Sequence, residues 1–194
     1  MDERQEQWES RYAAVDRLWS EQPNDWLPEL AAAWEPGRAL DLGCGEGADA
    51  VWLAERGWEV TGVDLSATAI ARMEAEARLR GLEERVHGVV LDVTREELPV
   101  GPFDLVAAFY VHGGPMPGSL DLVELLARGA GLVAPGGRLL TAVHCVNPPW
   151  HGHHACTYTP DELLAGLAGA TRGWQVEAGQ ERWREATGPD GEAG

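Results

Sequence analysis

Apolar and polar residues follow two alternating patterns between residues 38 and 143. Short apolar runs bounded by glycine, proline or acidic residues alternate with longer segments in which apolar residues recur every three or four positions. The short runs are typical of buried parallel strands, and the longer segments are typical of amphipathic helices. This alternation predicts an α/β fold built on a doubly wound parallel sheet. The predicted strands cover residues 38–42, 58–64, 86–91, 102–109 and 139–143, and the predicted helices between them cover residues 48–56, 67–80 and 120–132.

Residues with capping chemistry mark the ends of these helices. Gly57 and Gly81 follow the first two helices, and glycine readily takes the left-handed conformation that ends a helix. Ser66 and Ser119 precede two of the helices, where a serine hydroxyl can accept a hydrogen bond from a free backbone N–H. The run at 159–162, Thr-Pro-Asp-Glu, has the form of a capping box and predicts a further helix to about residue 167.

Aromatic residues at helical spacing stand out in the first 20 residues of the chain. Trp8, Tyr12, Val15 and Trp19 fall on one side of a helix, so this stretch predicts an amphipathic helix, and a second short helix is expected at 28–34. The aromatic stripe has two interpretations. It packs into the core, or it forms a lid over a bound ligand.

The end of the chain carries a less complete pattern. Residues 174–185 alternate in polarity and predict a final strand, but a turn sequence, Gly-Pro-Asp-Gly-Glu-Ala-Gly, follows at 188–194 with no strand after it. We therefore expect the last strand of the sheet to be missing or disordered here. The alternative is that a partner covers the sheet edge.

A glycine-rich turn joins the first predicted strand to the helix that follows it. Gly43, Gly45 and Gly47 leave backbone N–H groups uncovered, so a ligand can approach the main chain closely. Spacing alone leaves open which nucleotide-like ligand binds, because the turn also satisfies the dinucleotide fingerprint with Asp64 about 20 residues further on. Asp41, just before the turn, would repel a pyrophosphate but could hold the amino group of a cationic ligand.

These residues resemble the first motif of the class I S-adenosylmethionine-dependent methyltransferases, which reads acidic-x-Gly-x-Gly-x-Gly. The Pro-Gly-Gly turn at 135–137 and the acid-led strand at 102–109 resemble later parts of the same family. The resemblance implies a Rossmann-like seven-stranded sheet of order 3-2-1-4-5-7-6 and S-adenosylmethionine as cofactor. In the family, the glycine turn packs against the methionine part, an acid after the second strand binds the ribose, and an acid after the third lies beside the adenine amino group. The cofactor contacts expected here are Asp41, Gly43, Cys44, Gly45, Gly47, Asp64, Leu65, Asp92, Val93 and Phe109.

The N-terminal aromatic residues look like the lid helix of small methyltransferases related to tellurite-resistance and thiopurine enzymes. On this interpretation the chain is a single domain, with a helical cap at 1–34, a Rossmann-like core at 35–185 and a flexible turn at 186–194. Methyl transfer from a sulfonium needs the nucleophile held in line in a dry pocket, and a protonated acceptor also needs a base. His112 is the preferred base and Tyr110 the alternative, since both follow the fourth strand. The predicted acceptor-binding residues are Trp8, Tyr12, Trp19, His144, His151 and His153.

The segment 144–156 is rich in histidine and cysteine and invites a metal hypothesis. Its spacing fits no known zinc finger, so we predict a lid or substrate-binding loop and no metal. Asn147 begins an Asn-Pro-Pro-Trp run that resembles an amino-methyltransferase motif. In those families the motif follows the fourth strand and here it follows the fifth, so a rigid loop is the better interpretation.

Charge and composition narrow the function classes. The 194 residues carry a formal net charge of −17 and no lysine, which disfavours nucleic acid and anionic membranes as partners. Three cysteines do not make a disulfide framework, and the chain shows neither a signal peptide nor a long apolar stretch. We expect a soluble, cytoplasmic monomer or homodimer that acts on a small molecule.

The sequence thus predicts a methyltransferase that moves a methyl group from S-adenosylmethionine to a sulfur, selenium, tellurium, nitrogen or oxygen atom of a small molecule. Two alternatives stay open. One is a regulatory protein that binds S-adenosylmethionine or S-adenosylhomocysteine without turnover, and the other is an NAD(P)-binding oxidoreductase.

Overall fold

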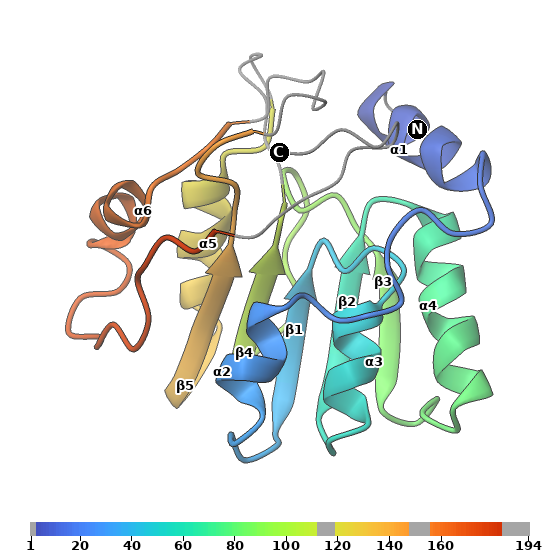
Figure 1. The fold of residues 1–194 in the computed structure, drawn as a ribbon, viewed down its shortest axis with the longest axis horizontal. Helices are drawn as coiled ribbons and strands as arrows, with labels where there is room; N and C mark the ends of the chain where they lie inside the picture. Colours follow the sequence, from blue (N-terminus) through green and yellow to red (C-terminus); the bar gives the residue numbers. More distant parts are fainter. Residues whose placement is uncertain (1–2, 112–118, 148–155, 184–194) are drawn as a thin grey trace.

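A computed structural model describes residues 3–111, 119–147 and 156–183. Its sheet has five parallel strands in the order β3-β2-β1-β4-β5 (Figure 1). The strands are β1 (Arg38–Leu42), β2 (Glu59–Asp64), β3 (Val86–Val90), β4 (Phe103–Phe109) and β5 (Val133–Ala142). The helices are α1 (Glu3–Ala13), α2 (Trp26–Ala31), α3 (Ala48–Ala54), α4 (Ala67–Leu79), α5 (Leu122–Ala130) and α6 (Pro160–Leu167). The α/β fold class and the strand order from 3 to 5 are therefore confirmed.

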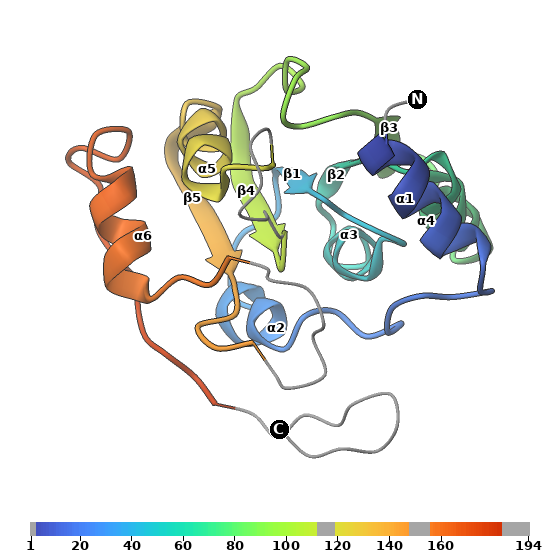
Figure 2. The ribbon, with the colours of Figure 1, turned by 90° about the horizontal axis from the view of Figure 1, so that it is seen from above.

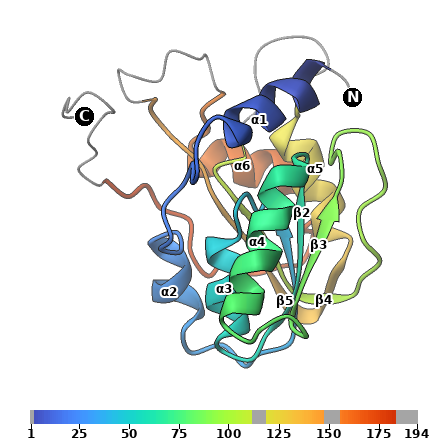
Figure 3. The ribbon, with the colours of Figure 1, turned by 90° about the vertical axis from the view of Figure 1, so that its right-hand side faces the viewer.

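Helices cover both faces of the sheet, as Figures 2 and 3 show. One core cluster joins α2, α3 and α4 to one face, with Leu53 and Met73 fully buried. The other joins α5 and α6 to the opposite face, with Leu126 fully buried. Residues along β1 alternate between the two clusters, since Ala39 faces the first and Leu40 the second. The sheet thereby holds the carboxyl ends of β1, β2 and β4 together at one edge.

The N-terminal helix is shorter than the aromatic spacing predicts. It ends at Ala13, so Val15 and Trp19 lie beyond it. The reason lies in contacts that the residues after Ala13 make with other elements of the fold. The carboxylate of Glu46 accepts hydrogen bonds from the backbone N–H groups of Leu18 and Trp19, at 2.9 Å each, and the guanidinium of Arg72 donates to the carbonyl of Val15. Backbone groups that bond to other elements in this way are not available to continue a helix.

The predicted last strand is wrong for the residues that can be judged. Residues 174–183 form no strand, because an extended segment needs a paired neighbour to complete its hydrogen bonds. Side chains hold the segment instead. Glu177 forms an ion pair with Arg138 of β5, and Arg182 forms one with Glu29 of α2. Accordingly, β5 is the last strand of the described sheet.

Two local predictions also need correction. Asp121, not Ser119, caps α5, since its carboxylate accepts a hydrogen bond from the backbone N–H of Glu124 at 3.0 Å. Aspartate is as good a cap as serine and stands directly before the helix. The third strand is not buried throughout, because β3 is a sheet edge and leaves Val89 and Val90 exposed. Within the described ranges, no helix is long and apolar enough to cross a membrane.

Candidate active site

The glycine turn lies between β1 and α3, as expected. Gly43, Gly45 and Gly47 have φ angles of 72°, 54° and 81°, a region that side chains other than glycine rarely adopt. A Cβ on Gly47 would lie 2.2 Å from Cγ of Met73, so this glycine is also required by packing. The backbone N–H groups of Gly43 and Cys44 donate to the carbonyl of Val63 at the end of β2. The turn is therefore held against the strand that carries Asp64. The N–H of Gly45 donates to Asp64 and that of Gly47 to the carbonyl of Cys44, so the expectation that the three glycines leave their N–H groups uncovered is wrong: the turn uses them to fix its own shape.

Asp64 organises this turn through both of its carboxylate oxygens. Oδ2 accepts a hydrogen bond from the backbone N–H of Gly45 at 3.0 Å, and Oδ1 accepts one from that of Ser66 at 2.9 Å. Burial raises the pKa of Asp64, although these backbone hydrogen bonds oppose the shift. The side chain thus stands between the glycine turn and the start of α4, where a ribose is expected.

A second buried carboxyl, that of Asp41, has fewer hydrogen-bond partners than that of Asp64. Its side chain is only 2% exposed, and its Oδ2 atom has no hydrogen-bond partner among the described residues. Burial raises the pKa of Asp41, and the nearby carboxyls of Asp49 and Asp64 raise it further. A buried carboxylate oxygen without a donor is costly, and a bound cation would relieve that cost. The site thus fits a ligand that carries a cationic hydrogen-bond donor.

Asp92 lies just after β3 and is held by more partners than the sequence indicated. It accepts hydrogen bonds from the backbone and hydroxyl of Thr94 and forms an ion pair with Arg4 of α1. Burial raises the pKa of Asp92, but the bonds to Thr94 and Arg4 outweigh that effect and lower it overall. A cavity of about 420 Å³ adjoins it, and its lining includes Gln5 and Leu65. This is a suitable place for a flat ring beside Asp92.

The N-terminal segment covers the glycine turn. Tyr12 is buried, its hydroxyl accepts a hydrogen bond from Nε1 of Trp19 at 2.9 Å, and both side chains lie within 3.3 Å of the position that a Cβ on Gly45 would take. Burial raises the pKa of Tyr12, and the charge of Asp64 adds to the shift. Trp8 lies four residues before Tyr12 in α1, with its ring centroid 6.1 Å from that of Tyr12. The three predicted aromatic residues thus come together, next to the glycine turn.

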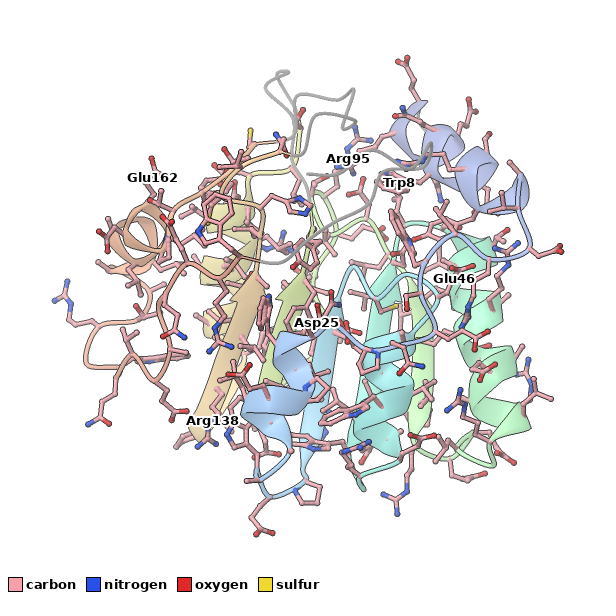
Figure 4. All side chains as sticks on the ribbon, viewed as in Figure 1. Trp8, Asp25, Glu46, Arg95, Arg138 and Glu162 are labelled. Carbon is pink, nitrogen blue, oxygen red and sulfur yellow. The ribbon has the colours of Figure 1, made fainter. Side chains whose placement is uncertain are left out.

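The sequence alone does not identify the polar residues that hold the N-terminal segment in place. Glu9 accepts hydrogen bonds from Ser66 and Thr68 at the start of α4. Glu46 is 3% exposed, and besides binding the backbone of residues 18 and 19 it forms an ion pair with Arg72 at 2.7 Å. Figure 4 shows Glu46 below α1. No sequence motif marks these residues, because their partners are distant in the chain.

The carboxyl end of β4 brings together two candidate residues. Tyr110 has φ of 52°, the only positive value recorded for a residue other than glycine in the described chain, and its ring lies 4.8 Å from that of His144 after β5. Strain of this kind clusters at binding and catalytic sites. Phe109 is buried just before it. His112, His151 and His153 lie outside the described residues.

The remaining predicted site residues offer few groups that could react or bind a cofactor. Burial raises the pKa of the Cys44 thiol, so the group stays protonated near neutrality. The carbonyl of Val93 accepts a hydrogen bond from Arg128 of α5. In the described ranges no three histidine, cysteine or acidic side chains gather into a metal site.

Comparison with known proteins now decides the family. The family described as "Methyltransferase domain" matches residues 39–137, from β1 through the glycine turn to the start of β5. This is more than half of the chain. The chain belongs to the methyltransferase-domain family. The glycine turn, Asp64 at the end of β2 and Asp92 after β3 all lie inside the matched region, and S-adenosylmethionine is the cofactor of this class I fold.

Individual relatives and solved structures are similar to this chain at 24–32% sequence identity. The ubiquinone biosynthesis O-methyltransferase of Alkalilimnicola ehrlichii is 32% identical over 78% of this chain and 58% of its own length. The S-adenosylmethionine-dependent methyltransferase SibL, in its apo form, shares the fold with a TM-score of 0.68 and 24% identity, over 90% of this chain and 58% of its own. The [4+2]-cyclase SpnF has a TM-score of 0.58 and 26% identity, over 75% and 55%. The chain thus spans about half the length of the proteins it matches.

Proposed function

We propose that this member of the methyltransferase-domain family transfers a methyl group from S-adenosylmethionine to a sulfur, selenium, tellurium, nitrogen or oxygen atom of a small molecule. The observation that carries the proposal is the Asp41 carboxyl, buried beneath the glycine turn with one oxygen unpartnered among the described residues. A dinucleotide pyrophosphate is an anion and would be repelled by Asp41 and the neighbouring Asp49, whereas Asp64 is compatible with either ligand. A cationic cofactor would instead be attracted.

The chain's own residues would hold that cofactor in three places. Asp41 and the glycine turn would take its amino-acid end, Asp64 its ribose, and Asp92 its adenine, after exchanging or sharing the bond with Arg4. When bound, S-adenosylmethionine supplies a methyl group on a sulfonium that a nucleophile can displace. Tyr12 and Trp19 would cover the turn and exclude water.

An acceptor would approach from the carboxyl ends of β4 and β5. Tyr110 and His144 lie there, in ring contact, and either could orient the acceptor or take its proton. His112 stays a candidate base by its position after β4. The cap of aromatic residues supports a relationship to the tellurite-resistance and thiopurine branch. We further propose that the protein works as a monomer or homodimer in the cytoplasm and does not act on nucleic acid, in line with its net charge of −17.

A non-catalytic role is the second candidate. SpnF, called a cyclase, shows that proteins of this fold are not all named for methyl transfer. A protein that binds the cofactor and regulates another process would keep the turn, Asp41 and Asp64 but would show no turnover.

The test is titration calorimetry with S-adenosylmethionine, S-adenosylhomocysteine and NADH, on the natural protein and on Asp64→Ala. Micromolar binding of the first two ligands, about −8 kcal/mol, that weakens in the variant supports the cofactor site. Release of S-adenosylhomocysteine with thiols, phenols or amines then separates an enzyme from a regulatory protein. Binding of NADH alone would overturn the proposal.

A further inference from the structure

Arg4 in the first turn of α1 contacts Asp92, the acid that follows β3, although the two residues are 88 positions apart in the chain. Its guanidinium forms an ion pair with Oδ1 of Asp92 and donates a hydrogen bond to the hydroxyl of Thr94 at 2.8 Å. Figures 1 and 2 show α1 over the ends of β3 and α4. The N-terminal helix is thus attached directly to the acid that is expected to bind adenine.

The two carboxylate oxygens of Asp92 have different surroundings. Oδ1 accepts three hydrogen bonds, from the backbone N–H of Thr94 at 2.9 Å, from the hydroxyl of the same residue at 2.6 Å, and from Arg4. Among the described residues Oδ2 accepts no hydrogen bond, and it lies 3.7 Å from Nε of Arg95, which is beyond hydrogen-bond distance. Oδ2 is therefore the oxygen that can accept a hydrogen bond from a ligand.

The cavity of about 420 Å³ beside Asp92 is built partly by α1. Gln5 lines it from this helix, and Leu65, Val90 and Leu91 line it from the ends of β2 and β3. The side-chain amide of Gln5 also donates a hydrogen bond to the backbone carbonyl of Leu65 at 3.4 Å. A volume of this size is in the range of small-molecule sites. A flat ring in this cavity would contact apolar side chains and reach the carboxylate of Asp92.

The groups around Asp92 keep its carboxylate ionised. Burial by itself raises the pKa of Asp92, but the hydrogen bonds from Thr94 and Arg4 and the charge of Arg4 outweigh burial and lower the pKa overall. Two more charged residues line the cavity. Oε2 of Glu96 accepts a hydrogen bond from the backbone N–H of Asp92 at 2.7 Å, and the side chain of Arg95 is 65% exposed. Because an ionised carboxylate only accepts hydrogen bonds, its ligand must offer a donor, as the 6-amino group of adenine does.

We propose that Arg4 is a positioning residue of the adenine site. Together with Thr94 it holds Oδ1 of Asp92, and so leaves Oδ2 to accept a hydrogen bond from the 6-amino group. Arg4 therefore stays in place when the ligand binds, and α1 helps to select a purine that carries a donor at C6. The inference rests on the proposed function, since it takes the ligand to be an adenosyl cofactor.

Two ligands that differ only in the 6-amino group test this role. They are S-adenosylhomocysteine and its 6-deamino analogue, in which C6 carries a hydrogen atom. Titration calorimetry with each ligand gives the preference of the protein, defined as the ratio of the two Kd values. A hydrogen bond to a charged group predicts that the natural protein prefers S-adenosylhomocysteine by about 10- to 150-fold.

Two variants remove the hold on Oδ1 of Asp92 in different ways. Arg4→Met removes the guanidinium and keeps a long side chain with good helix propensity. Thr94→Val removes the hydroxyl and leaves α1 unchanged. We expect each variant to lower the preference by at least about 5-fold, with little change in the Kd of the deamino analogue. In Arg4→Met the preference should also disappear at a higher pH than in the natural protein, because the pKa of Asp92 rises when the bond and the charge of Arg4 are lost.

Two further variants are matched controls. Glu9→Gln weakens a different attachment of α1, since Glu9 accepts hydrogen bonds from Ser66 and Thr68 at the start of α4. It should change both Kd values by the same factor and keep the preference. Arg78→Met repeats the change of charge at a position of α4 where the side chain is 59% exposed, and it should alter neither Kd by more than about 2-fold. Far-UV circular dichroism checks that all four variants fold.

Several results would overturn the inference. They are equal affinity of the natural protein for the two ligands, a preference that Arg4→Met and Thr94→Val leave unchanged, or an equal weakening of both ligands, which a merely structural role of Arg4 predicts. Tighter binding of S-adenosylhomocysteine in Arg4→Met would also overturn it, because Arg4 would then compete with the amino group for Asp92. In each of these cases the natural protein still binds S-adenosylhomocysteine, so the proposed function stands. If the natural protein binds neither ligand, the proposed function and the inference fail together.

Discussion

Replacement of Asp41 by asparagine is the sharpest test of how this chain recognises its cofactor. Asparagine keeps the size of the side chain and removes its charge. In the free protein Asp41 is buried, its pKa is raised by burial and by two neighbouring carboxyls, and Oδ2 has no partner among the described residues. Loss of the charge should therefore not destabilise the free protein. It should weaken binding of S-adenosylmethionine, because the ammonium loses its charged partner.

The size of the effect follows from the strength of a charged hydrogen bond. Such a bond contributes about 1.5–3 kcal/mol, which corresponds to a loss of about 10- to 150-fold in affinity. At a ligand concentration of about 100 times the natural Kd, binding stabilises the natural protein by about 2.7 kcal/mol and the variant by about 0.3–1.3 kcal/mol. For a chain of this size, about 2–4 °C per kcal/mol, the ligand-induced rise in Tm should fall from about 5–11 °C to about 1–5 °C.

Thermal unfolding with and without S-adenosylmethionine measures this difference directly. Glu59→Gln is the control, since it removes one negative charge from an exposed position at the opposite end of β2. The control should keep the full ligand-induced shift. If Asp41→Asn also keeps it, or if both variants lose it equally, Asp41 does not hold the cofactor and only the net charge of the protein matters.

Three further predictions concern the glycine turn, the N-terminal segment and the pH dependence of stability. Gly47→Ala should destabilise the protein by about 2–5 kcal/mol, the sum of left-handed strain and a clash with Met73. Gly81→Ala, with φ of 69° and nothing within 4 Å of its Cβ, should cost only about 1–2 kcal/mol in the same urea titration; equal costs would refute the packing argument. Glu46→Gln removes the ion pair with Arg72, so limited proteolysis of residues 14–24 should become faster. Unchanged proteolysis would mean that Glu46 does not hold this segment in place. The raised pKa values of Asp41, Asp49 and Asp64 contribute stability at low pH that is lost as pH rises through their folded pKa values. The lowered pKa values of Glu9 and Asp92 contribute stability that is complete above their usual values of 4.5 and 3.8. From about pH 5 upward, the Tm of the free protein should therefore fall, and less steeply in Asp41→Asn; a Tm that rises over this range would contradict the assignment.

The glycine turn and most of the strand pattern were predictable from local sequence. The start of β5 was not: a turn was predicted at 135–137 and a strand from 139, but β5 begins at Val133 and takes in the Pro-Gly-Gly run through an irregularity in its pairing with β4. β1 was predicted with both of its bounds, and the capping box of α6 was also predicted and is present. Local rules succeed there because a strand buried on both faces, a glycine with positive φ or a cap each depend on a few adjacent residues. The edge character of β3 and the cap of α5 were less predictable, since they depend on which neighbours lie alongside.

The sequence by itself therefore determined the α/β class, the glycine turn flanked by Asp41 and Asp64, and the class I methyltransferase family. Only the tertiary structure decided how residues 3–24 pack against that turn, that Arg4 pairs with Asp92, and that Tyr110 contacts His144. The physical reason is separation along the chain. Arg4 and Asp92 are 88 residues apart, and no local pattern records which distant charges and rings will meet once the sheet has formed.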